Sequence, residues 1–158
     1  MPYSPTTEIL TFCDKLVATL VASWELGSPN KAERVYWAPI PLKDLQGRQV
    51  WVFPTHYDFG TEDRGEDHLA HDVTVLIARR YENPGPVPTD WIDQEVDWVN
   101  VNIVKGFYFT RPPYLSWGTR LVHTIPPVQV DVIDLAKLTT DNLFLATVDF
   151  HFEEIQNA

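Results

Sequence analysis

Histidines and carboxylates gather between His56 and Asp72, the part of the chain that is richest in side chains able to bind a metal ion. Imidazole and carboxylate together can hold zinc or a similar metal. His68 and His71 are three residues apart, so in a strand they point to opposite faces. The helical zinc motif needs two histidines four residues apart around a glutamate, and the acids lack the D-x-D-x-D-G order of a calcium loop. We therefore expect a solvated acidic loop without metal or cofactor; the alternative is a metal-dependent hydrolase that uses His56, His68, His71 and Asp72.

Nucleophilic chemistry has no clear carrier in this sequence. Cys13 lies on the apolar stripe of a predicted helix, which is typical of a buried thiol rather than of a nucleophile. Ser116 stands in an SWG sequence and lacks the preceding glycine of a G-x-S-x-G elbow. The seven glycines are scattered and form no phosphate-binding loop. We expect no catalytic residues and no enzyme, although the plentiful acids leave a carboxylate pair of the glycosidase type open.

Aromatic side chains crowd one segment that is predicted to be a loop. The candidate residues there are Phe107, Tyr108, Phe109, Arg111, Tyr114 and Trp117. Aromatic residues beside an arginine are typical anchors of protein–protein interfaces. We predict an interaction surface here; the alternative is a loop that folds back over the core.

The formal net charge of −10 comes from two acidic stretches. Residues 56–72 contain six acids and one base, and so do residues 131–158. Binding to a nucleic-acid backbone needs clustered lysines and arginines, and the sequence has no such cluster. The acids favour either solubility or a surface that DNA passes without binding. The candidates for such a surface are Asp58, Glu62, Asp63, Glu66 and Asp67.

The length of 158 residues fits one domain. No stretch has the roughly 18–20 consecutive apolar residues that span a bilayer, and the first residues lack the pattern of an export signal. The single cysteine fits a reducing compartment. We expect one soluble domain over residues 1–158, with extended loops near 38–48, 56–67 and 106–120.

The first half of the chain combines a helix with strands. Ser4-Pro5 resembles a helix start, and apolar residues then recur at three- and four-residue spacing from Ile9 to Trp24, which predicts an amphipathic helix. Residues 34–37 and 49–55 are aromatic and β-branched, which predicts strands. Residues 69–78 are apolar on both faces, so this strand is expected at the centre of its sheet.

A second amphipathic helix and further strands complete the pattern. Thr89 is the predicted N-cap of that helix, and Gly106 its end. Alternating valines at 128–132 predict a strand, Asp134 begins a single helical turn, and residues 144–152 alternate most clearly of all. This order predicts an α+β fold, a mainly antiparallel sheet with two amphipathic helices packed on one face.

The order of elements resembles the tail terminator, or tail completion, proteins of tailed bacteriophages over nearly the whole chain. The matching segments are the helix TTEILTFCDKLVATLVASW, the charged loop Arg64-Gly65-Glu66-Asp67, the strand HDVTVLIARR, the helix PTDWIDQEVDWVNVNIV, the strand QVDVID and the terminal strand LFLATVDFHFEE. The aromatic segment and the 39–47 connection have no counterpart in this pattern.

The resemblance implies a structural virion protein. Such a protein forms a homohexameric ring at the head-proximal end of the tail tube, ends tube polymerisation and joins the tail to the head connector. Its implied partners are copies of itself, the tail tube protein and the head–tail connector protein, while DNA passes through the bore without specific binding and no membrane is involved. Its implied location is the tail or neck of the virion, and the host cytoplasm during assembly. Another neck component, such as a head-closure connector subunit, is the alternative.

Overall fold

The structure, a computed structural model, describes residues 8–23, 31–37, 44–61, 67–108, 115–117, 120–132 and 135–156. The elements follow in the order α1 (Glu8–Ser23), β1 (Lys31–Arg34), β2 (Arg48–Thr61), β3 (Asp67–Arg80), α2 (Thr89–Val99), η2 (Asn100–Val104), β4 (Leu115–Trp117), β5 (Arg120–Asp131), α3 (Leu135–Asp141) and β6 (Leu143–Gln156). The segment η2 is π-helical and continues α2 directly.

The strands form one six-stranded sheet in the order β1-β2-β3-β6-β5-β4. β1 runs parallel to β2, and every other neighbouring pair is antiparallel. The predicted α+β class with a mainly antiparallel sheet is confirmed. β3 lies between β2 and β6, as expected for the strand that is apolar on both faces.

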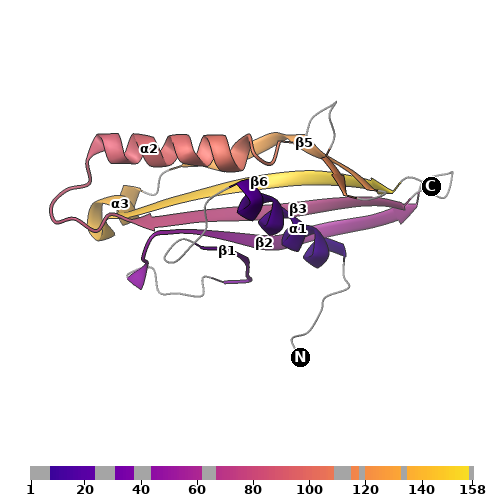
Figure 1. Cartoon of the computed structure of the whole chain (residues 1–158), viewed down its shortest axis with the longest axis horizontal. Coiled ribbons are helices and arrows are strands. Elements are labelled where there is room, and N and C mark those ends of the chain that lie inside the picture. Colours follow the sequence, from indigo (N-terminus) through magenta and orange to yellow (C-terminus); the bar gives the residue numbers. More distant parts are fainter. Residues whose placement is uncertain are drawn as a thin grey trace.

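Both long helices pack on the same face of the sheet, which we call the covered face. Figure 1 shows α1 crossing in front of the middle strands, α2 running along the β6–β5 side, and α3 at one end. A single apolar cluster joins the two helices to the strands. Its fully buried members include Phe12, Leu16, Val50, Val75, Val99, Ile103, Val148 and Phe150. The period-two pattern of β6 causes this arrangement, because every second side chain points under the helices.

The opposite face, called here the second face, is apolar at one end and polar at the other. At the apolar end Trp51 packs with Ala78 and Leu143 beneath Leu45, a residue of the segment that precedes β2. At the polar end the cross-strand neighbours are histidines, acids and threonines. This face therefore has a smaller core than the covered face.

Three expected loop or cap positions are corrected. Residues 56–61 belong to β2 and pair in register with β3, so most of the expected 56–67 loop is a hairpin arm. Backbone pairing outweighs the polar composition there, because every second residue of β3, such as Leu69, is still buried. Within the expected 106–120 loop, residues 115–117 form β4. α2 begins at Thr89 itself, Pro88 holds the N-cap position, and no side chain caps the helix.

Candidate functional site

The outer edge of β2 borders a groove beside the start of α1. On its outer side, β2 pairs with β1 only as far as Val52. From there to Thr61 this side of β2 has no strand partner in the described ranges, while the other side pairs with β3. An open cavity of about 280 Å³ follows the free stretch. Its lining residues are Ile9, Leu10, Tyr36, Pro54, Thr55, His56 and Tyr57. We call this site the β2 groove.

Large aromatic side chains stay exposed around the β2 groove. The exposed fractions are 58% for Tyr36, 73% for Trp37 and 42% for Tyr57. Rings of this size are expected to pack when no partner is needed, and clustered exposed ones mark interaction surfaces. The groove is therefore suited to an extended segment with apolar side chains.

Pro54 limits what can pair with this edge. The Val35 N–H donates to the Val52 carbonyl at 3.0 Å, so the backbone polar groups of Val52 point outward, and the alternation of the strand turns those of Pro54 outward too. Proline has no N–H to donate, and edge strands with proline resist indiscriminate pairing. Side-chain contacts in the groove must then select the partner.

The opposite edge of the sheet is also only partly covered. β4 pairs with β5 over Arg120–Val122, and from Ile125 to Asp131 the outer side of β5 has no strand partner in the part of the chain that the structure describes. Ile125 is 36% exposed and Val130 38%, and the Pro126–Pro127 pair between them is exposed as well. We call residues 125–131 the β5 edge.

The predicted aromatic surface is only partly preserved. Phe107 is 1% exposed and packs edge-on against Phe150 at 5.9 Å between ring centroids, so it is a core residue and its interface assignment is corrected. Its position is fixed because the Thr124 hydroxyl donates to its carbonyl at 2.6 Å. Tyr108 is 41% exposed and remains a candidate. Phe109, Arg111 and Tyr114 lie outside the described residues, and so does the side chain of Trp117 in β4.

The predicted acidic surface is described at two positions. Asp58 is exposed on β2 and accepts a hydrogen bond from His56 Nε2 at 3.1 Å. Asp67 is the first residue of β3, with its side chain outside what is described. Glu62, Asp63 and Glu66 lie outside the described residues. Among the five predicted acids, Asp58 is thus the one whose side chain the structure describes, and it is exposed.

The residues of the hydrolase alternative do not meet at one site. His71 points to the covered face and is fully buried, whereas His56 and Asp72 lie on the second face; the His68 side chain is outside the described set. On the second face, Asp72 instead pairs with His151. Among the side chains that are described, no three of the types that bind metals are grouped to hold an ion.

Two further pairs complete a polar stripe on the second face. His123 Nε2 lies 2.9 Å from Glu153 Oε2 across β5 and β6. Thr74 donates to Asp149 Oδ1 at 2.6 Å across β3 and β6. Their side chains hold neighbouring strands in register, as cross-strand pairs do.

A buried imidazole–carboxylate pair lies under α1. His71 Nε2 is 2.9 Å from Glu154 Oε2, and both side chains are nearly or fully buried. The ring of Phe12 stacks on His71 at 4.3 Å, which ties α1 to β3. Because the pair is sealed by apolar side chains, it contributes to the specificity of packing rather than to a site that a substrate reaches.

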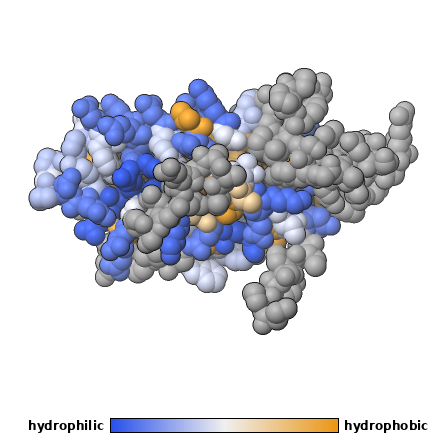
Figure 2. All heavy atoms as spheres, viewed as in Figure 1, coloured by the Kyte–Doolittle hydropathy of each residue, from blue (hydrophilic) through white to orange (hydrophobic). Residues whose placement is uncertain are grey.

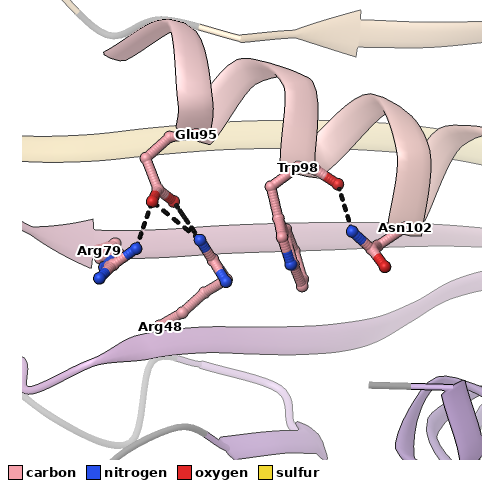
Figure 3. Close-up of polar contacts among 5 residues, drawn as sticks. All are labelled: Arg48, Arg79, Glu95, Trp98 and Asn102. Carbon is pink, nitrogen blue, oxygen red and sulfur yellow. Dashed lines mark hydrogen bonds and ion pairs between the residues drawn. The ribbon is translucent and has the colours of Figure 1, made fainter. Parts of the chain in front are cut away.

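An arginine–glutamate cluster anchors α2 to the sheet. Figure 3 shows Glu95 from α2 between Arg48 of β2 and Arg79 of β3. Arg48 Nη2 lies 2.8 Å from Glu95 Oε1, and its guanidinium carbon lies 4.0 Å from the centre of the Trp98 ring. Burial lowers the pKa of Arg48, and the Glu95 carboxylate counteracts that effect. Both carboxylate oxygens of Glu95 accept hydrogen bonds from the two arginines, so the cluster stabilises the fold.

The single cysteine is not a nucleophile. Cys13 is fully buried, and removal from water raises the pKa of its thiol to about 12. A thiol of this kind stays protonated and unreactive. The expectation of a buried thiol is confirmed.

Most of the described surface is polar in one view of the molecule (Figure 2). Figure 2 shows hydrophilic side chains over most of the described surface in that view, above all over α2 and α3, with small hydrophobic areas between them. No helix in the described segments is long and apolar enough to cross a membrane.

The sequence prediction missed the β2 groove and the β5 edge. The composition of residues 34–37 predicts a strand that includes Tyr36 and Trp37, but β1 ends at Arg34, and Ile125 follows no clear pattern. The available signal was proline, which indicates an edge where it lies inside a strand: Pro54 in β2, and Pro126 and Pro127 in β5.

No protein-family model matches this chain, and no curated protein is significantly similar to it in sequence.

Proposed function

We propose that the chain is a structural subunit of the tail terminator type, which forms a ring at the head-proximal end of a phage tail tube and joins the tube to the head connector. One observation carries the proposal: the sheet has two unlike edges on opposite sides, and each exposes large apolar side chains. A ring needs two different, complementary patches on every subunit. The β2 groove and the β5 edge are such a pair.

The fold class also supports the proposal. The resemblance implies a mainly antiparallel sheet with two amphipathic helices on one face, and the chain has this arrangement. The helix α2 is held rigidly by Glu95 and its two arginines. A rigid sheet with a fixed helix layer suits a subunit whose work is to present surfaces.

The distribution of charge fits a pore that DNA crosses. The net charge is −10, and described acids such as Asp58 are exposed on the sheet. Phosphates are repelled by such a surface, so DNA passes without forming ion pairs. We expect acids of this kind, with Glu62, Asp63, Glu66 and Asp67 as further candidates, to face the bore.

Electron microscopy of tail tubes tests the proposal. Gold-labelled chain is mixed with tubes assembled from the tail tube protein of the same virus. We expect label at one end only of each tube, and no elongation from labelled ends when fresh tube protein is added. Label along the tube wall, or continued growth from labelled ends, would contradict the proposal. Label on isolated connectors but never on tubes would favour a head-closure subunit instead.

A further inference from the structure

We infer that successive copies join head to tail, with the β5 edge of one copy docked along the β2 groove of the next. This inference rests on the proposed ring and deepens it by assigning the two surfaces that meet. The partner is therefore a second copy of this chain.

The strand directions allow this contact to continue the sheet. From β2 to β5 the sheet passes through three antiparallel pairings, so β2 and β5 run in opposite directions within one copy. A second copy in the same orientation places its β5 antiparallel to the first copy's β2. Antiparallel pairing of free edges is a common way for two chains to associate.

The shapes and chemistry of the two surfaces match. The β2 groove is hollow and lined by Tyr36 and Tyr57, while the β5 edge carries the exposed Ile125 and the exposed Pro126–Pro127 pair. Proline and isoleucine side chains pack well against aromatic rings, and prolines need no hydrogen bond from the partner strand. Pro54 likewise lacks a donor, so the contact depends on side chains more than on a complete ladder.

Charge complementarity sets the direction. In an antiparallel contact the Asp131 end of β5 comes to the β1 end of the groove, where Arg34 lies. Arg34 Nε already binds Asp14 at 2.7 Å, and a guanidinium has five N–H donors for additional acceptors. At the other end His123 approaches Asp58. The contact thus brings the Asp131 carboxylate to an arginine at one end and an imidazole to the Asp58 carboxylate at the other.

Burial of apolar surface favours a second copy as the partner. Among the described residues, seven large hydrophobic side chains are exposed. Five of them lie by one of the two edges: Tyr36, Trp37 and Tyr57 by the β2 groove, and Ile125 and Val130 on the β5 edge. A symmetric contact of two β2 grooves would leave the β5 edges exposed, whereas the head-to-tail contact covers both kinds of edge in every copy.

Disulfide trapping between single-cysteine variants tests the assignment. The variants are His56→Cys in the β2 groove and Ile125→Cys on the β5 edge, both exposed, both on the second face and at the same level of the sheet. Cys13 does not interfere because it is fully buried. Under mild oxidation we expect the mixture of the two variants to give a mixed dimer, either variant alone to give little, and the double variant to give a ladder of multimers. Glu82→Cys, exposed in the β3–α2 connection, is the matched control and should not cross-link with either partner.

The outcomes separate this inference from the proposed function. Cross-links within the His56→Cys variant alone, or no cross-links at the highest soluble concentration with and without tail tubes, overturn the head-to-tail assignment. If tubes are still capped at one end in that case, the ring proposal stands and only the choice of edges is wrong. If the mixed dimer and the ladder form but tubes are never capped, the edges are right and the proposed function is wrong.

Discussion

The covered face of the sheet and its two outer edges satisfy their side chains in different ways. On the covered face the apolar residues at the centre of the core are fully buried, and polar ones such as Glu95 and His71 have partners within the chain. At the edges, aromatic and aliphatic side chains are exposed to between about a third and three quarters of their surface, as with Ile125 and Trp37. The covered face is therefore satisfied within one copy, whereas side chains at the edges are exposed.

This difference predicts two kinds of mutational effect. A change on the covered face removes contacts made within one copy, so it lowers the free energy of unfolding. In the head-to-tail arrangement proposed above, a change at an edge removes contacts with a neighbouring copy, so it should leave stability nearly unchanged and weaken association. Matched substitutions on the two regions test this division.

Val148→Asp should have the largest effect. Val148 is fully buried under the helices, and an unpaired carboxylate there costs more than about 4 kcal/mol, enough to prevent folding. Val130→Asp is the matched control, because Val130 is the register partner of Val148 and is 38% exposed. It should lose less than about 1 kcal/mol by urea unfolding. Equal losses in the two variants would show that the β5 edge belongs to the core.

Glu95→Gln should be the next most damaging change. The substitution leaves Arg48, whose side chain is 12% exposed, without its counter-charge, and loss of one member of a buried pair costs about 3 kcal/mol. Glu153→Gln removes a carboxylate from the less buried pair with His123 and should cost less than about 1 kcal/mol. The comparison is made by urea unfolding at neutral pH. A Glu95→Gln variant as stable as Glu153→Gln would mean that the cluster does not anchor α2.

Gly106→Ala should destabilise the chain by roughly 1–3 kcal/mol. A Cβ atom at Gly106 would lie 2.1 Å from the Asn102 carbonyl oxygen, so the turn after η2 must shift. That turn delivers Phe107 to the core. Gly60→Ala is the control, because its Cβ would meet nothing within 4 Å, and it should be neutral or stabilising by up to about 1 kcal/mol. Thermal unfolding measures both changes.

The ionisation of Cys13 makes stability fall at alkaline pH. The thiol pKa is raised from 9.0 to about 12 in the folded chain, so the unfolded chain loses this proton first. Stability from this group is therefore constant below pH 9 and falls by about 1.4 kcal/mol per unit between the two pKa values. Between about pH 8 and about pH 10, the difference in unfolding free energy between the unmodified chain and Cys13→Ala should shift by about 1 kcal/mol against the unmodified chain. A pH-independent difference would contradict the burial of the thiol.

Much of the fold follows from periodicity in the sequence. The alternation in residues 144–152 and the stripe of the first helix predict which side chains meet, because one face of each must be buried. The extension of β2 to Thr61 was not predictable, since its residues are polar and only pairing with β3 makes them a strand. The π-helical turn at η2 was missed as well, because one extra residue in a turn leaves the apolar spacing almost unchanged.

The candidate surfaces were less accessible to sequence reasoning than the fold. Phe107 and Tyr108 are adjacent aromatics, and only the direction of the turn after η2 makes one buried and the other exposed. The β2 groove combines α1, the residues after β1 and the middle of β2, which are far apart in sequence. Edges are a property of strand order, and strand order appears only when the sheet is assembled.

Tyr36→Ala should have the smallest effect on stability and a clear effect on association. Tyr36 is 58% exposed, and its contact with Arg34 is a weak one at 3.4 Å between Nη1 and the hydroxyl, so unfolding free energy should change by less than about 0.5 kcal/mol. In the trapping experiment, the yield of mixed dimer should fall severalfold when the variant also carries His56→Cys. Tyr36→Phe keeps the ring and should keep the yield. If Tyr36→Ala lowers stability strongly while cross-linking is unchanged, the ring belongs to the packing of one copy, and the division between face and edges fails at the groove itself.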